Sequence, residues 1–312
     1  HYDAMYIGHM DTVFPDGTAE KRPFRIEGEN YYGPGVGDMK NGDLAMFHIA
    51  ANLPETEKKC LNIAMVYNPD EEIGSIYSKE ITDRIGCQAD HIFVMESAGK
   101  NGTRHCFARK GSLTYDIEFQ GQAAHAGFMF EVENASAVLE MGHYIVELMN
   151  LADREKDTTV NVGVANGGTA RNVVADHAKI SVEMRFWDDS ERIRLKEYVN
   201  KITKGQPFVP GVKTTIAMQK ETPPFVKTEE AKKYIERVRK VAEEQGIPFE
   251  EKDRGGLSDA NHLSRCGNAI VMDGMGPHGA NDHSEKEYGY IGSVEPCVKL
   301  HLAILKDMLK KQ

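Results

Sequence analysis

The sequence lacks the features that mark several large classes of protein. Its five cysteines include no C-x-x-C pair, so neither a thiolate zinc site nor a disulfide framework is expected. No apolar run approaches the length of a membrane span. Basic residues are fewer than acidic ones, 38 against 48, and the net charge of −10 argues against binding to phosphate backbones. We therefore expect no membrane or nucleic-acid partner, and a reducing compartment, the cytoplasm, as the location.

What is present is the composition of a globular protein. The 312 residues are 40% hydrophobic and 28% charged, which suits two domains of ordinary size. The chain opens inside an apolar segment, residues 4–8, that indicates a buried strand. A start within an element predicts that further sequence precedes it.

The first stretch, residues 1–108, alternates short apolar runs with helical patterns. Buried strands are predicted at 4–8, 61–68 and 91–95, and a helix at 42–53. This alternation predicts a parallel sheet with helices on both faces.

The second stretch, residues 109–220, has a different pattern, because apolar and polar residues alternate along its strands. Strands are predicted at 112–120, 158–165, 178–186 and 213–218, and helices at 134–152 and 190–204. Strand, helix, strand, strand, helix, strand is the ferredoxin-like order.

The third stretch, residues 221–312, returns to the first pattern. It predicts helices at 228–245 and 293–309 and a strand at 268–272. The fold class is therefore α/β: a discontinuous catalytic domain, 1–108 with 221–312, has a mostly parallel mixed sheet. An α+β domain of ferredoxin-like type, 109–220, is inserted into it.

Polar residues follow the predicted strands of the first stretch. His9 and Asp11 end the first strand, and residues two apart project to the same side of a strand. A carboxylate beside a histidine fixes its tautomer and strengthens it as a metal ligand. The alternative is a strand-terminal histidine beside a turn-forming aspartate.

Carboxylates follow the next two strands. Glu71 and Glu72 are adjacent, so they repel each other and a cation is a natural reason for them to coexist. Glu96 follows the strand at 91–95. Ligands of open α/β sheets bind at the carboxyl ends of the strands, where these groups are expected to meet. The alternative for the adjacent pair is a solvated acidic turn.

A glycine-rich loop, residues 33–42, precedes the helix at 42–53 and contains Asp38. A phosphate cradle is one interpretation, although the loop lacks the lysine of a P-loop. Asp38 is otherwise a metal ligand on a rigid turn or a helix N-cap. Near the C-terminus, His278 and His283 compete for a ligand role. Histidine and carboxylate without cysteine suits zinc in a hydrolytic site.

Eight segments occur together in an order that is specific, although each is weak alone. They are GHMDTV (8–13), the glycine loop (33–42), DEEIG (70–74), MES (95–97), GQAAHAG (121–127), GGTARNVV (167–174), GGLSDAN (255–261) and DHS (282–284). In these segments the chain resembles the M20 metallopeptidases, and most closely their glutamate carboxypeptidase-like branch. Members of that family carry further sequence before the first segment, and Leu257 stands where glycine is more usual.

The resemblance implies a site with two Zn²⁺ ions, which Co²⁺ or Mn²⁺ could replace. The implied ligands are His9 and Glu96 for one ion, Glu72 and His283 for the other, and Asp38 bridging both. Glu71 is the implied general base, and Asp11 the partner that orients His9. The family pattern favours His283 over His278, and a cis peptide after Asp38.

The inserted domain resembles the family's lid and dimerisation domain, which implies a homodimer. His125 matches a histidine that stabilises the oxyanion at the partner's site, and Asn172 and Arg185 match substrate-binding residues. A loop histidine without a ligand is the alternative for His125. Arg185 could instead pair with Glu183 or Asp188.

The expected function is hydrolysis of an amide bond next to a carboxylate-bearing residue, in a small peptide or an N-acyl amino acid. Glu71 would take a proton from the attacking water and pass it to the leaving nitrogen. Two enzymes fit this expectation: a carboxypeptidase or dipeptidase, with glutamate as a candidate product, and an N-acyl amino acid deacylase. A catalytically silent binding or scaffold protein is the alternative from another class.

Overall fold

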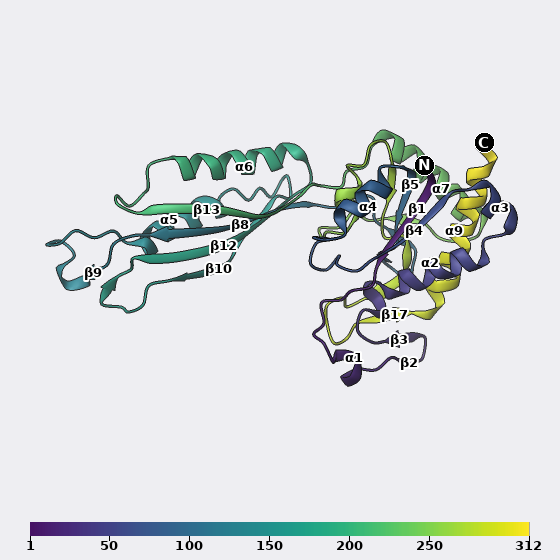
Figure 1. Ribbon diagram of the computed structural model, residues 1–312, viewed down its shortest axis with the longest axis horizontal. Coiled ribbons are helices and arrows are strands. Elements are labelled where there is room, and N and C mark those ends of the chain that lie inside the picture. The colour runs from purple at the N-terminus through teal and green to yellow at the C-terminus, as the bar shows by residue number, and fades with distance from the viewer. Residues whose placement is uncertain (312) are drawn as a thin grey trace. The chain divides into compact units, whose positions relative to one another are not determined.

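A computed structural model describes residues 1–311 (Figure 1). The chain divides into two compact units: unit 1 is His1–Arg109 with Phe225–Gln312, and unit 2 is Lys110–Pro224. Unit 2 is inserted between the two parts of unit 1, which is the arrangement of the expected fold class.

Four parallel strands form the central sheet of unit 1, in the order β15, β5, β1, β4. Their bounds are Ile270–Met272 (β15), Ala89–Val94 (β5), Tyr2–His9 (β1) and Ile63–Asn68 (β4). Because neighbouring strands run in the same direction, the carboxyl ends of β1, β4 and β5 lie at one edge of the sheet.

Both faces of this sheet are buried, which explains why its strands are continuous apolar runs. Ala4 and Tyr6 of β1 face a core built with α2, α7 and α9, whereas Met5 and Ile7 face a core with α4 and α8 (Figure 1). The bounds are Asn41–Asn52 (α2), Lys79–Gly86 (α4), Glu229–Glu244 (α7), Ala260–Leu263 (α8) and Val294–Met308 (α9). Helices on both faces confirm the prediction from strand–helix alternation.

Unit 1 has a second sheet, mixed and five-stranded, that the sequence pattern does not predict. Its order is β2, β3, β17, β16, β6, and only β16 and β6 run parallel. The bounds are Arg25–Glu27 (β2), Asn30–Tyr32 (β3), Tyr288–Tyr290 (β17), Gly276–Ala280 (β16) and Ser97–Ala98 (β6). Strands this short show no periodicity. The sheet joins the start of the chain to the segment that carries His283.

Unit 2 is an antiparallel four-stranded sheet with two helices. The sheet order is β10, β12, β8, β13. The elements are β8 (Gly111–Gln120), α5 (Ala137–Met149), β10 (Thr159–Gly167), β12 (His177–Phe186), α6 (Asp189–Lys204) and β13 (Lys213–Thr222). Alternate residues of β8 and β12 point into one core that both helices cover. Element order and sheet order confirm the ferredoxin-like prediction.

The remaining elements are short connections. They are α1 (Thr18–Lys21), α3 (Glu55–Cys60), β7 (Arg104–His105) paired with β14 (Glu250–Glu251), β9 (Ala124–His125) paired with β11 (Val173–Val174), and single turns at Val36–Lys40, Ala126–Phe128, Ile291–Ser293 and Leu309–Lys311.

The start of α7 agrees with the boundary predicted from the sequence, whereas the end of β13 does not. The Thr228 side chain accepts a hydrogen bond from Ala231 N, 3.1 Å away, so α7 begins where the N-cap pattern predicts. Strand β13, in contrast, continues to Thr222, because it goes on pairing with β8 beyond an irregularity between Met218 and Lys220. The inserted unit therefore extends to Pro224, beyond the expected boundary at residue 220.

Within the described part of the chain, all five cysteines are free thiols. No helix there combines the length and the apolar character needed to cross a membrane.

A buried neutral histidine lies in the main core of unit 1. His301 of α9 has no exposed surface, and its Nε2 donates to Met275 O at 2.9 Å. Its Nδ1 lies 3.2 Å from the Tyr6 hydroxyl, which donates to it. Burial lowers the pKa of His301 from 6.5 to about 4. Between about pH 6.5 and pH 4, the His301 imidazole is therefore protonated in the unfolded chain and neutral in the folded protein.

We expect the folded protein to lose stability as the pH falls through this window. Relative to a His301→Gln variant, which still donates to Met275 O, the wild type should lose about 2 kcal/mol more between pH 7.5 and pH 5. Urea denaturation at the two pH values measures this difference. His48→Gln, on the exposed face of α2, is the control and should behave as the wild type. Equal pH dependence in wild type and His301→Gln would contradict the assignment.

Candidate metal centre

The predicted ligands follow neighbouring strands of the parallel sheet. His9 is the last residue of β1 and pairs in register with Asn68, the last residue of β4. Glu71 and Glu72 follow β4, and Glu96 lies two residues beyond the end of β5. These side chains therefore start from the same edge of the sheet.

The buried His9 is the centre of one half of the site. Its Nε2 lies 3.2 Å from Asp38 Oδ1 and 3.6 Å from Glu96 Oε1. The His9 side chain is only 1% exposed, so both carboxylates reach it within the protein. This half brings together the three residues that the resemblance assigns to one ion.

His283 is the centre of the other half. Its Nε2 lies 3.0 Å from Asp38 Oδ2 and 3.2 Å from Glu72 Oε2. Asp38 therefore directs one carboxylate oxygen toward each histidine. The peptide bond after Asp38 is cis, as the family pattern leads one to expect.

His278, the competing histidine, does not face these carboxylates with its Nδ1. It lies buried in β16, and its Nδ1 is bonded to Ala98 O at 2.9 Å. Its backbone N donates to Ser293 Oγ at 2.8 Å. Of the two histidines, His283 is the one that the structure brings to Asp38 and Glu72.

Asp11 connects His9 to the acidic loop. Its Oδ1 lies 3.4 Å from His9 Nδ1, on the side of the ring opposite Asp38. The same carboxylate accepts hydrogen bonds from the backbone N atoms of Glu71 (3.2 Å) and Glu72 (3.0 Å). Asp11 therefore contacts both the His9 ring and the backbone of the two glutamates, and its backbone O lies 3.2 Å from His9 Nδ1.

The carboxylates of the site are crowded and partly or fully buried. Burial, followed by the nearby charge of Glu96, raises the pKa of Glu71 well above its usual value. Burial and the charge of Asp38 raise the pKa of Glu72 to about 7 and also raise that of Glu96. In this group each carboxylate therefore opposes ionisation of its neighbours.

His9 carries the opposite shift. Burial opposes its protonation, but the carboxylates of Asp11, Asp38 and Glu96 together raise its pKa far above the usual range. The positive charge of protonated His9 is next to the same carboxylates that a bound metal cation would neutralise. Metal binding would therefore displace this proton.

The residues present fit a divalent cation. His9, Asp38 and Glu72 offer ligand atoms that all lie within 4.8 Å of one another. Glu72 Oε1 is buried and has no hydrogen-bond partner among the described residues, so it is available to a ligand. Imidazole with carboxylate, and no thiolate, is a donor set typical of hydrolytic zinc sites.

A residue that the strand pattern missed holds the acidic loop at both ends. Asp259 accepts from Asn68 Nδ2 at 2.8 Å, before Glu71 and Glu72, and from Ser75 Oγ at 2.5 Å, after them. Asp259 is buried and also contacts His262 Nε2 at 2.9 Å. Its segment, residues 255–261, was recognised only through the family resemblance, because it follows no predicted strand.

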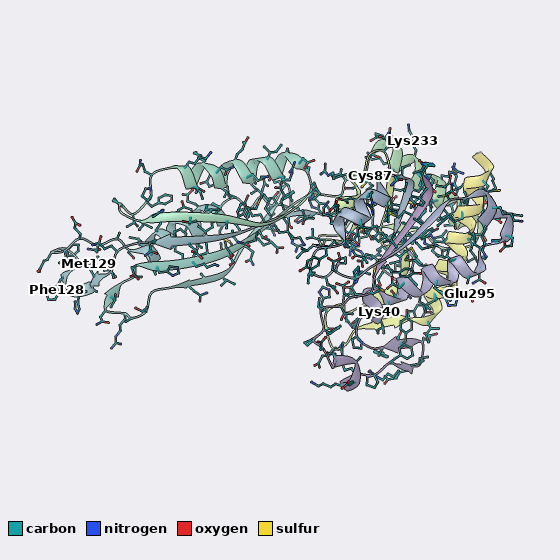
Figure 2. All side chains as sticks on the ribbon, viewed as in Figure 1. Lys40, Cys87, Phe128, Met129, Lys233 and Glu295 are labelled. Atoms are coloured by element: carbon teal, nitrogen blue, oxygen red, sulfur yellow. The ribbon has the colours of Figure 1, made fainter. Side chains whose placement is uncertain are left out.

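Two predicted residues lie together in unit 2. His125 of β9 pairs with Val173 of β11, and Ala126 N donates to Asn172 O at 2.9 Å. Phe128 and Met129, labelled in Figure 2, are exposed, and the centroid of the Phe128 ring lies 5.2 Å from that of the His125 ring. The His125 Nδ1 accepts from Gly127 N at 3.1 Å, which leaves Nε2 as the ring atom able to face a substrate.

Arg185 lies in β12 of the four-stranded sheet, not in the β9–β11 pair. It pairs with Ser112 at the start of β8, whereas His177 pairs with Gln120 at its end, roughly 26 Å away at the usual rise of a strand. Its Nη2 donates to Glu183 Oε1 at 2.7 Å, which is one of the ion pairs considered from the sequence. Unit 2 therefore does not bring Arg185 to His125.

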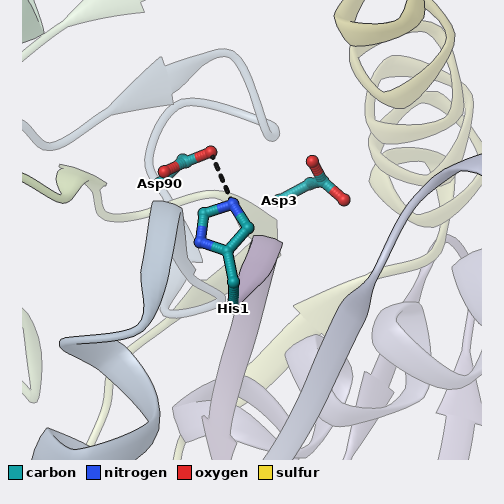
Figure 3. A group of neighbouring side chains, drawn as sticks. All are labelled: His1, Asp3 and Asp90. Carbon is teal, nitrogen blue, oxygen red and sulfur yellow. Dashed lines mark ion pairs between the residues drawn. The ribbon is translucent and has the colours of Figure 1, made fainter.

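A second acidic group lies at the opposite edge of the parallel sheet. His1, Asp3 and Asp90 stand near the amino ends of β1 and β5, and His1 Nε2 lies 3.2 Å from Asp90 Oδ2 (Figure 3). His1 and Asp90 are exposed, so water can solvate their charges. Exposed acidic groups of this kind need no ion.

Comparison with known sequences decides the family of the chain. The profile described as peptidase family M20/M25/M40 matches residues 5–307. The chain belongs to this family. As an M20 metallopeptidase it is a hydrolytic enzyme that uses a divalent metal, and the acidic group around Asp38 is where the structure gathers suitable donors.

Its M20 relatives differ in the bonds they cleave. The chain is 25% identical to carboxypeptidase G2 of Pseudomonas sp. (strain RS-16), over 97% of this chain and 73% of that protein. It is 24% identical to succinyl-diaminopimelate desuccinylase of Helicobacter pylori (strain HPAG1), over 98% of this chain and 80% of that protein. The structure of aminopeptidase PepT from Bacillus cereus ATCC 10987 shares its fold, with a TM-score of 0.78 and 24% identity over 99% of this chain and 81% of that chain.

We expect removal of divalent cations from this M20 enzyme to lower its stability. The crowded carboxylates are then left without a compensating charge, and zinc at about 100 times its dissociation constant should restore about 3 kcal/mol. Denaturation of chelator-treated protein with and without added Zn²⁺ measures the shift. In Asp38→Asn the zinc-dependent shift should largely disappear. A shift of wild-type size in that variant would show that zinc stabilises the protein from some other site.

Proposed function

We propose that this enzyme holds two divalent cations, best matched by Zn²⁺, and hydrolyses an amide bond next to a carboxylate-bearing residue. The observation that carries the proposal is the orientation of Asp38. Its Oδ1 faces His9 and its Oδ2 faces His283, at 3.2 and 3.0 Å. One bridging carboxylate between two sets of donors suits a pair of ions better than a single one.

The assignment of donors follows from the two halves of the site. His9 and Glu96 would hold one ion, Glu72 and His283 the other, and Asp38 would bridge them; Co²⁺ or Mn²⁺ could occupy the same donors. When bound, such ions lower the pKa of water and polarise the carbonyl of the scissile amide.

Glu71 is the carboxylate best placed to move the proton. It is adjacent to Glu72, and Asp11 holds its backbone N, yet it is not needed in either donor set. Burial favours its protonated form, so it can accept a proton from the attacking water. Glu71 then delivers this proton to the nitrogen of the leaving amine.

Unit 2 carries the residues that we propose contact the substrate. His125 and Asn172 lie together, which suits a role at one point of the substrate, with His125 Nε2 supporting the developing oxyanion. Arg185 lies at the end where the chain enters and leaves the unit, so it would read a substrate carboxylate separately. We propose a homodimer in which His125 serves the partner's site, and light scattering of the purified protein tests the dimer.

The leaving group separates the two enzymatic alternatives. A carboxypeptidase releases an amino acid from a peptide, as the name of carboxypeptidase G2 implies for that relative. A dipeptidase would do the same with a dipeptide, and glutamate is our candidate for the amino acid released. A deacylase releases an acyl group from an N-acyl amino acid, as the desuccinylase name implies for another. The family match disfavours the silent scaffold. The cytoplasmic location stays a prediction.

A substrate panel tests the proposal. α- and γ-linked glutamyl peptides, glycyl dipeptides and N-acetyl or N-succinyl amino acids should be offered to zinc-loaded enzyme, with release of free amine as the measurement. Cleavage that requires a free carboxylate next to the amide supports the proposal. Equal cleavage of amidated substrates would contradict the carboxylate requirement.

We expect Glu71→Gln to retain metal and lose turnover. The amide cannot accept a proton, so kcat should fall by about 10²- to 10⁴-fold. Metal content and turnover on the best substrate of the panel are the measurements. Glu80→Gln, an exposed position in α4, is the matched control and should keep full activity. Wild-type turnover in Glu71→Gln would eliminate the proposed role.

A further inference from the structure

Glu287 is a buried carboxylate beside the glycine-rich loop. It stands directly before β17, is 1% exposed, and accepts hydrogen bonds from the backbone N atoms of Gly35, Gly37 and Asp38. The three N–O distances are 2.8, 2.8 and 3.0 Å. All three donors are neutral amides, so the described hydrogen bonds of Glu287 serve to hold the loop.

The loop therefore has the form of an anion-binding turn, and the anion that it binds is the protein's own Glu287 carboxylate. Successive backbone amides in a glycine turn attract an anion, which is why a phosphate site was one interpretation of this sequence. Gly35 has a φ of +72°, which favours glycine, and a Cβ on Gly37 would lie 2.9 Å from Tyr288 O. β17 passes close to the loop, and Glu287, directly before β17, lies against its amides.

The anion-binding turn acts on the residue that joins the two halves of the metal centre. The amide of Asp38 is one of the three donors, so its backbone is tethered directly to Glu287. The Asp38 carboxylate faces His9 with one oxygen and His283 with the other. A small displacement of this backbone would move both oxygens together.

We propose that Glu287 is a positioning residue on which the occupancy of both metal sites depends, through the amide of Asp38. This inference rests on the proposed function, because it assumes two ions bridged by Asp38. Glu287 does not itself face the ions in this account. It differs in this from Glu72 and Glu96, each of which belongs to one half of the site, so that removing either should weaken mainly one ion.

Two measurements test this role without relying on activity. The first is hydrogen–deuterium exchange of metal-free protein in peptides covering residues 33–39. Glu287→Gln should accelerate exchange of this segment. One of the two carboxylate oxygens becomes an NH₂ group, which cannot accept a hydrogen bond from a loop amide. The second is titration with Zn²⁺ or Co²⁺, in which Glu287→Gln should weaken both binding steps by about 10- to 100-fold.

Glu285→Gln is the matched control, two residues away, exposed and altered by the same chemical change. It should match the wild type in both measurements. If Glu287→Gln does not fold, Glu287→Asp takes its place, since it keeps the charge and shortens the side chain by one methylene.

The outcomes separate this inference from the proposal on which it rests. Wild-type protein that binds only one ion overturns the two-ion proposal. Two ions in the wild type, with unchanged exchange in the Glu287 variant or with loss of only one binding step, overturns the role of Glu287. Faster exchange together with weakening of both steps supports it.

Discussion

The structure of unit 1 depends on keeping several carboxylates close together in a partly buried space. Asp38, Glu72 and Glu96 approach two histidines within 3.0 to 3.6 Å, and Glu71 is adjacent. Their mutual repulsion and the loss of hydration both oppose this arrangement. A divalent cation compensates such charge, and the fold must hold the ligands in place before the cation arrives.

The parallel sheet supplies the first part of that support. Because β1, β4 and β5 end at the same edge, three sequence segments far apart deliver His9, the Glu71–Glu72 pair and Glu96 to one place. Packing of both faces of the sheet against helices holds these strands in place, because the side chains on each face fill a separate close-packed core. The stability of the apolar cores is therefore what aligns the polar ends.

Three further carboxylates hold the ligand loops through neutral donors. Asp11 accepts from the amides of Glu71 and Glu72, Asp259 accepts from the residues on either side of that pair, and Glu287 accepts from the glycine loop. Amide and hydroxyl donors bring no net charge, so they fix the loops without competing with a metal for the ligand carboxylates. In each case a supporting carboxylate holds the segment that carries a ligand carboxylate, and a neutral amide or hydroxyl donor makes the contact.

The sequence by itself determined the alternation of strands and helices, the ferredoxin-like order of unit 2 and the polar residues that follow each strand. These are local properties, which periodicity and residue type express directly. The family segments already favoured His283 over His278, and the tertiary structure brings His283 to Asp38. Only the tertiary structure decided that Glu287 and Asp259 hold the loops. The short strands β16 and β17 bring His283 and Glu287 into place through pairing with distant segments, and a strand of three to five residues carries no periodic signal of its partner.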